Sequence, residues 1–174
     1  FVHDPHVNVG NVDFYYDPMD KISKLVSCNI QEMIEHEVDI IFVCVPTPMF
    51  SDGETDLSIV REVCHDINEI VQSSTDPFKN PAVVIKSTVI PGTTKKLNET
   101  FPYISVMFNP EFLREATYLK DFLYQNRIVL GYDYDKSSMV SPIVLENVKK
   151  FYYEFLCRRY SDFSDSIEKM IHVF

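Results

Sequence analysis

The sequence has little positive charge. Its 16 lysines and arginines stand against 26 aspartates and glutamates, which gives a formal net charge of −10 and an isoelectric point near 4.9. Proteins that bind the phosphate backbone of nucleic acids usually carry a clustered basic surface, and no segment of this chain supplies one. We therefore expect no nucleic-acid partner.

Long apolar runs and closely spaced metal ligands are also missing. No hydrophobic stretch approaches the roughly 20 residues that a membrane-spanning helix needs, and the first residues form neither a basic patch nor a cleavable apolar segment. The four cysteines are widely spaced without a CxxC pair, and the five histidines show no spacing typical of zinc ligands. The sequence thus predicts a soluble, cytoplasmic protein with buried thiols, no membrane contact and no metal.

What the sequence does contain is an alternation of two kinds of apolar segment, with no internal repeat. Apolar, β-branched runs of strand length recur at 39–45, 82–85, 104–108 and 127–130. Segments with apolar residues at helical spacing lie at 56–73, 92–100 and 141–157. In the last of these, Val144, Val148 and Tyr152 belong to the apolar face. This order predicts a doubly wound parallel α/β sheet, whose ligands bind at the carboxyl ends of the strands.

The end of the chain predicts a further helix. Ser164 and Asp165 can cap a helix that begins at Ser166 and continues to Phe174. We therefore expect a main domain over 1–163 and the start of a connecting helix over 164–174.

Two motifs follow predicted strands. Val45-Pro46-Thr47-Pro48 is a rigid turn that can face a ligand, although proline turns of this kind are common in ordinary loops. Lys86-Ser87-Thr88 ends the next strand, and Pro91-Gly92-Thr93 begins a helix whose free amides can face a polar or anionic ligand. The hydroxyl of Thr88 can orient a water or a ligand amide; the alternative is a simple turn or capping residue.

A third motif, 109–115, reads Asn-Pro-Glu-Phe-Leu-Arg-Glu. Glu111 and Glu115 would share one face of a helix, whereas in an extended turn either could point into a cleft. Carboxylates near a reacting alcohol can act as acid or base. The alternative is a solvated acidic pair that flanks Arg114.

The three motifs, in this order and rough spacing, resemble those of the nucleotide-sugar dehydrogenases, the UDP-glucose/GDP-mannose dehydrogenase family. The resemblance implies a Rossmann-like NAD-binding domain and oxidation of a nucleotide sugar, with UDP-glucose converted to UDP-glucuronate as the leading possibility. It implies catalytic roles for Thr88, Glu111 and Glu115. It further implies NAD contacts from Asp17, Thr47, Pro48, Thr88 and Glu115, and sugar contacts from Phe112, Leu113 and Arg114. Asp17, which follows the apolar run 12–16, is the preferred ribose-binding carboxylate; Asp4 is the alternative, and a turn role for Asp17 before Pro18 stays open. Enzymes of this family dimerise through the connecting helix, of which this sequence holds only the start, so a homodimer is one outcome and the oligomeric state stays open.

Parts of that family pattern are absent from these 174 residues. The four glycines are scattered and form no G-x-G-x-x-G turn, so either the chain is a fragment or the first strand and helix of the fold have been lost. None of the cysteines has the neighbours of the family's nucleophile, Ala116 replaces the usual glycine, and Asn126 replaces the usual aspartate. We therefore expect little or no turnover from this chain alone. The alternative function is a non-catalytic remnant that binds a nucleotide or serves as an interaction module.

Overall fold

The computed structural model describes residues 3, 29–35, 38–74, 80–132, 142–159 and 168–174. The chain divides into two compact units, residues 1–38 and residues 39–174. In the first unit, helix α1 (Ile30–Glu35) begins with a reciprocal cap. The Asn29 Oδ1 atom accepts the amide of Glu32 at 2.8 Å, and the Glu32 carboxylate accepts the amide of Asn29 at 3.1 Å.

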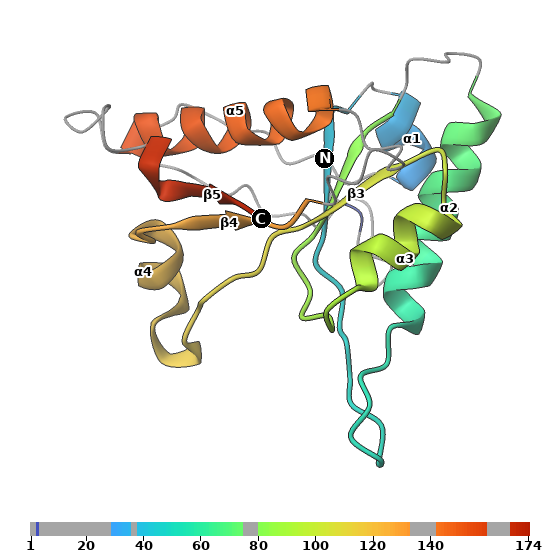
Figure 1. Ribbon diagram of the computed structural model, residues 1–174, viewed down its shortest axis with the longest axis horizontal. Helices are drawn as coiled ribbons and strands as arrows, with labels where there is room; N and C mark the ends of the chain where they lie inside the picture. The colour runs from blue at the N-terminus through green and yellow to red at the C-terminus, as the bar shows by residue number, and fades with distance from the viewer. Residues whose placement is uncertain (1–2, 4–28, 36–37, 75–79, 133–141, 160–167) are drawn as a thin grey trace. The chain divides into compact units, whose positions relative to one another are not determined.

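The second unit is built on a parallel sheet of three strands in the order β1-β2-β3, comprising β1 (Ile40–Val43), β2 (Ala82–Ile85) and β3 (Ser105–Phe108). Helix α2 (Ser58–Ser73) connects β1 to β2, and helix α3 (Thr93–Thr100) connects β2 to β3 (Figure 1). All four residues of β2 are buried, as a strand covered on both faces requires. The α/β class and the parallel strands predicted from the sequence are confirmed.

One face of this sheet packs against helix α5 (Pro142–Arg159). Val84 and Met107 on the strands meet Val144, Val148 and Leu156 on the helix in one buried cluster. Because apolar residues recur every three or four positions along α5, the helix presents a continuous apolar stripe to the strands. The predicted helix at 141–157 is therefore confirmed, with its apolar face turned to the sheet.

The two connecting helices begin as the sequence predicts. The N-cap residue of α2 is Leu57, which makes no side-chain cap, and just ahead of it Asp56 Oδ1 accepts the amide of Ser58 at 2.8 Å. Hydrogen bonds from the amide and the side chain of Ser58 hold the pKa of the Asp56 carboxyl below its usual range. Gly92 precedes α3 with φ of 85°, a left-handed conformation that glycine adopts without strain.

A second, two-stranded parallel sheet continues from the first. It pairs β4 (Ile128–Leu130) with β5 (Ile171–Val173), and Phe108 and Gly131 join it to β3 by exchanging two backbone hydrogen bonds of 2.9 and 2.7 Å. Between β3 and β4 lie the 3-10 turn η1 (Glu115–Thr117) and helix α4 (Tyr118–Leu123). A 3-10 turn, η2 (Glu168–Met170), leads into β5.

The helix predicted from Ser166 to Phe174 is wrong. The β-branched Ile171 and Val173 favour an extended chain, and β4 offers an edge whose backbone groups need partners. Phe174 donates its amide to the Leu130 carbonyl at 2.9 Å and accepts that of Tyr132 at 2.7 Å, which extends the pairing. Residues 171–173 thus pair with β4, and residues 168–174 belong to the same compact unit, while the division of the chain at residue 163 stays a prediction. Within the described parts of the chain, no helix combines the length and the apolar character needed to cross a membrane.

Candidate functional site

Three strands end side by side at the carboxyl edge of the main sheet. In the strand register Val43 lies beside Ile85, which lies beside Phe108. The next residue of each strand is therefore also abreast: Cys44, Lys86 and Asn109. The amide of Lys86 donates to the Val43 carbonyl and that of Asn109 to the Ile85 carbonyl, both at 2.9 Å, so the ladder extends into this row. We call these three residues together with Tyr152 the carboxyl-edge cluster.

Asn109 is the centre of the carboxyl-edge cluster, and its side chain is almost fully buried, with 2 % exposed. Its Oδ1 atom accepts the Lys86 ammonium at 2.9 Å and also accepts the Tyr152 hydroxyl from α5. Its Nδ2 group donates to the Val129 carbonyl of β4 at 2.7 Å. One amide therefore ties together the exits of two strands, a third strand and a helix.

The turn after β1 is fixed by the turn after β2. Ser87 Oγ donates to the Val45 carbonyl at 2.6 Å and accepts the Val45 amide at 2.9 Å. Farther along, the amide of Asp56 donates to the Pro48 carbonyl at 2.7 Å and closes a hairpin that extends from the sheet (Figure 1). The predicted cofactor-facing residues Thr47 and Pro48 lie in this braced turn, Thr47 half-buried and Pro48 exposed.

Burial and charge act together in the carboxyl-edge cluster. Partial burial lowers the pKa of the Lys86 ammonium, while the nearby charge of Glu111 opposes that shift. Desolvation raises the pKa of the Cys44 thiol above its usual range, although the thiol lies in an exposed residue, and Lys86 opposes this shift. Burial also raises the pKa of the Tyr152 hydroxyl, with smaller contributions from Cys44 and Glu111, so this group stays a hydrogen-bond donor at neutral pH.

The structure places two of the three predicted catalytic residues at this edge. Thr88 is exposed and follows Lys86 by two positions, and Glu111 is exposed, follows Asn109 by two positions and acts electrostatically on Lys86. Glu115 is exposed at the start of η1 and is not among the charges that shift the pKa values of the cluster. Because Glu111 precedes η1, the shared helical face considered for the two glutamates does not form. Asp17 and Asp4 lie outside the described residues.

The predicted sugar-contacting residues line a separate hollow. Phe112, Leu113 and Arg114 border a volume of about 340 Å³ together with residues of α4 and of the turn before β4. The Arg127 guanidinium lies 4.6 Å from the centre of the Phe112 ring. Arg114 donates to both carboxylate oxygens of Asp121 at 3.0 and 2.7 Å, and these bonds hold the pKa of the Asp121 carboxyl far below its usual range.

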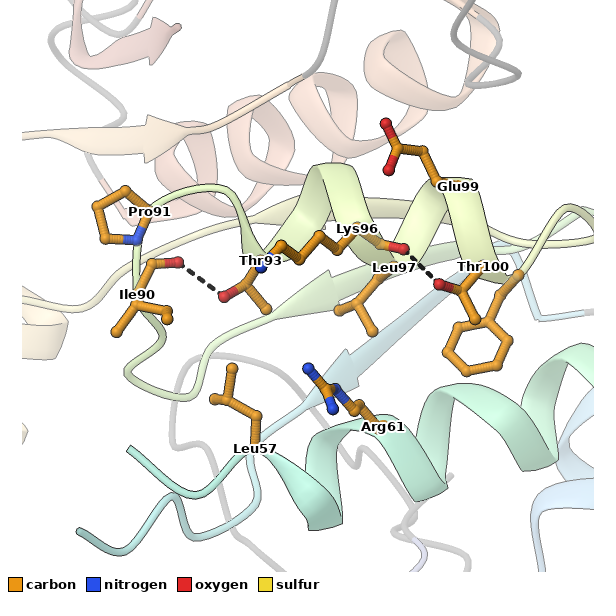
Figure 2. Close-up of a pocket in the computed structure, with 10 residues that line it drawn as sticks. Leu57, Arg61, Ile90, Pro91, Thr93, Lys96, Leu97, Glu99 and Thr100 are labelled. Carbon is orange, nitrogen blue, oxygen red and sulfur yellow. Dashed lines mark hydrogen bonds between the residues drawn. The ribbon is translucent and has the colours of Figure 1, made fainter. Parts of the chain in front are cut away.

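A second hollow, of about 370 Å³, lies between α2 and α3 and contains none of the predicted site residues. Figure 2 shows Leu57, just ahead of α2, and Arg61 on α2 pointing toward α3, whereas Glu99 points away from α2. Thr93 and Thr100 donate their hydroxyls to the carbonyls of Ile90 and Lys96 at 2.7 Å. These two hydroxyls therefore bond to carbonyls of the nearby backbone.

Sequence reasoning missed Lys86, Asn109 and Tyr152 as members of the site. The available signal was a lysine at the exit of a completely apolar strand, where a charge is costly to bury without a partner. The second signal was an asparagine at the corresponding position of the next strand. The hydroxyl of Tyr152 gave no signal of its own, because in the sequence it is part of the apolar face of α5.

Comparison with known proteins agrees with this geometry. Residues 18–156 match the model of the UDP-glucose/GDP-mannose dehydrogenase family, NAD binding domain. The UDP-glucose 6-dehydrogenase of Rickettsia typhi is 31 % identical over 152 residues, which cover 80 % of this chain and 33 % of that protein. The GDP-mannose 6-dehydrogenase of Pseudomonas aeruginosa is 34 % identical over 105 residues, covering 53 % and 23 % of the two chains.

Two solved structures share the fold. A ternary complex of GDP-mannose dehydrogenase from Pseudomonas aeruginosa gives a TM-score of 0.59 at 25 % identity, covering 74 % of this chain and 30 % of that one. A UDP-glucose dehydrogenase from Pyrobaculum islandicum gives a TM-score of 0.57 at 26 % identity, covering 86 % and 31 %. The chain thus spans a third or less of the length of each of these four relatives.

Proposed function

Because this chain belongs to the UDP-glucose/GDP-mannose dehydrogenase family, we propose that it is the NAD-binding part of an enzyme that oxidises UDP-glucose to UDP-glucuronate. The cofactor of the matched domain is NAD. Support for UDP-glucose comes from relatives of that activity in three Rickettsia species, which match 75 to 80 % of this chain. A cytoplasmic location, expected from the sequence, stays a prediction, and so does a homodimer.

The observation that carries the proposal is the position of Thr88 and Glu111 just beyond neighbouring strand ends. Ligands of open parallel sheets bind outside the carboxyl ends of the strands. Both side chains are exposed at this edge, and the Thr88 hydroxyl has no hydrogen-bond partner among the described residues. These polar groups fit NAD together with the braced turn that carries Thr47 and Pro48.

Each of these residues has a proposed role. When bound, NAD supplies the hydride acceptor for the oxidation. Thr88 would contact the cofactor and orient a water, and Glu111 would exchange protons with that water as acid or base. Glu115 would contact NAD and assist as a second carboxylate, and Phe112, Leu113 and Arg114 would border the sugar.

We propose that these 174 residues alone turn over little or no substrate, since no cysteine among them has the sequence context of the family's nucleophile. A non-catalytic nucleotide-binding or interaction module is the alternative function. A chain can keep Thr88 and Glu111 in its sequence after it has lost the ability to bind the cofactor. A pure chain that produced NADH steadily from UDP-glucose would contradict the first proposal.

Calorimetric titration with NAD tests the proposed site. We expect saturable binding that Thr88→Val weakens about tenfold, the effect of losing one hydrogen bond worth about 1.4 kcal/mol. Thr100→Val is the matched control, because it removes a threonine hydroxyl from the groove between α2 and α3. No heat of binding at millimolar NAD, or equal weakening by both variants, would favour the non-catalytic module.

A further inference from the structure

The hollow of about 340 Å³ beside α4 is more basic than the rest of the chain. Three of its lining residues, Arg114, Lys120 and Arg127, are cations, and among the described residues that line it the only carboxylate is that of Asp121. In the whole sequence acidic residues outnumber basic ones by 26 to 16. A local excess of positive charge in so acidic a chain points to an anionic ligand at this place.

One of the three cations is already neutralised. The Arg114 guanidinium donates twice to the Asp121 carboxylate, which also accepts the Arg114 amide at 3.0 Å and the Thr117 hydroxyl at 2.8 Å. These donors match the roughly four acceptor positions of a carboxylate, so Asp121 is saturated. The same bonds join the segment after β3 to α4 and give the hollow a fixed wall.

The charges of Lys120 and Arg127 are not neutralised in this way. Both side chains are exposed, and neither forms an ion pair within the described parts of the chain. The Arg127 guanidinium lies over the Phe112 ring, 4.6 Å from its centre. A ring that covers the face of a guanidinium holds it in place and leaves the N–H groups in its plane able to donate to an anion.

The chemistry of the hollow beside α4 fits a diphosphate. A guanidinium presents its donors as a planar fork that matches phosphate oxygens, and an ammonium adds a second, compact charge. The two unpaired cations match the two negative charges of a diphosphate that links a nucleoside to another group. The volume of the hollow, about 340 Å³, lies at the lower end of the range of roughly 300–1,000 Å³ for small-molecule sites.

Two ligands of the proposed enzyme contain such a diphosphate, NAD and the nucleotide sugar. The residues proposed to border the sugar, 112–114, line the hollow beside α4. No described residue proposed to contact NAD lines it, and Thr88 lies instead just beyond the end of β2. The position of the hollow therefore favours the nucleotide sugar over the cofactor.

We propose that the hollow beside α4 binds the diphosphate of the nucleotide sugar, with Lys120 and Arg127 as its phosphate contacts. The inference rests on the proposed function, which supplies the nucleotide sugar. Lys120 belongs to α4 and Arg127 to the turn before β4, so the phosphates lie within the segment that leaves β3 and returns to β4 (Figure 1). Phe112 holds the Arg127 guanidinium in place for this contact.

Calorimetric titration of the chain with UDP-glucose, at about 0.1 M salt, tests the site, and inorganic pyrophosphate is the probe for the phosphate groups alone. We expect Lys120→Gln and Arg127→Gln each to weaken the binding of both probes about tenfold, the effect of losing one charge-assisted hydrogen bond. Arg127→Lys keeps the charge but not the planar fork, so it should recover only part of the loss.

Lys95→Gln and Arg61→Gln are the matched controls. Each removes one exposed cation and so changes the net charge of the chain by the same amount, but neither residue lines the hollow beside α4. Both affinities should stay within about twofold, because charges farther away than about 10 Å are largely screened at this salt concentration. Equal weakening by the two pairs of variants, or no saturable binding of UDP-glucose at millimolar concentration, would overturn the proposal.

NAD titration of the same variants separates the two ligands and the two proposals. An affinity for NAD that falls in Lys120→Gln and Arg127→Gln would mean that the hollow holds the diphosphate of the cofactor, and would overturn its assignment to the nucleotide sugar. UDP-glucose binding that these variants weaken, in a chain that binds no NAD, would support the hollow and contradict the cofactor site. NAD binding that only Thr88→Val weakens, with UDP-glucose binding unchanged in the other variants, would support the cofactor site and overturn the diphosphate site.

Discussion

The carboxyl edge of the three-stranded sheet and the groove between α2 and α3 are two neighbouring regions of one unit with different properties. The groove encloses a hollow of about 370 Å³, but its threonine hydroxyls donate to nearby backbone carbonyls. Its two cations, Arg61 and Lys96, lie on different helices. The edge gathers an ammonium, a thiol, a carboxylate and a hydroxyl from four segments. Packing of α2 against α3 leaves the hollow, whereas the register of the strands brings the titratable side chains together.

The difference has a geometric cause. Parallel strands in register end together, so the first residue after each strand falls into one row. Side chains along two packed helices diverge around each helix axis, and few of them point to one place. In this unit the strand ends therefore offer a better guide to the site than the volume of a hollow.

The largest expected effect on stability comes from replacing Asn109, the centre of the carboxyl-edge cluster. Asn109→Leu leaves the Lys86 ammonium, the Tyr152 hydroxyl and the Val129 carbonyl without their partner, and should lower the free energy of unfolding by about 3 kcal/mol. Arg61→Leu in the groove changes an exposed side chain and should lower it by less than about 0.5 kcal/mol. Urea unfolding of the two variants measures both values. Equal losses would show that the hydrogen bonds of Asn109 contribute no more to the free energy of unfolding than an exposed side chain of the groove.

A second prediction contrasts two thiols. Burial in α2 raises the pKa of Cys64 to about 12, and no part of its side chain is accessible, whereas Cys44 is exposed at the edge. At pH 8 iodoacetamide should therefore label Cys44 on the order of a hundredfold faster than Cys64. Time-resolved mass spectrometry of the native chain gives the two rates. Comparable rates would mean that local opening of α2 exposes Cys64 to the reagent about as readily as Cys44 is exposed in the folded chain.

The smallest expected effect comes from removing single hydroxyls, one at the carboxyl edge and one in the groove. Ser87→Ala removes both hydrogen bonds that brace the turn after β1, and should lower the free energy of unfolding by about 1.5 kcal/mol. Thr100→Ala removes one exposed hydroxyl of the groove and should cost about 0.5 kcal/mol or less. Thermal unfolding of the two variants decides the order, and a larger loss in Thr100→Ala would contradict it.

The strands of the main sheet could be predicted because burial on both faces leaves a continuous apolar run in the sequence. Helix α2 could be predicted because apolar residues such as Ile59, Val63, Ile67 and Val71 recur at helical spacing, although only Ile67 and Val71 of these are buried. Strand β5 could not, since a few apolar residues fit either period, and its partner β4 lies far upstream in the chain. Pairing between distant segments is a tertiary event that local patterns do not record.

The candidate site divides in the same way. Thr88 and Glu111 could be predicted to follow strand ends, because each stands just after an apolar run that the sequence displays. The bond from Tyr152 to Asn109 could not, because it depends on how α5 lies across the sheet. Nor could the sequence show that Glu111 and Glu115 do not share a helical face, because the chain leaves β3 without forming a helix at Glu111.

The sequence by itself determined the alternation of strands and helices, the motifs at the strand ends and hence the family, because these depend on residues close together in the chain. Only the tertiary structure decided that the end of the chain becomes a strand and that Asn109 joins Lys86, Tyr152 and Val129. The physical reason is that a buried polar group must find its partner in space. Register and helix packing, which involve residues far apart in the chain, determine where that partner lies.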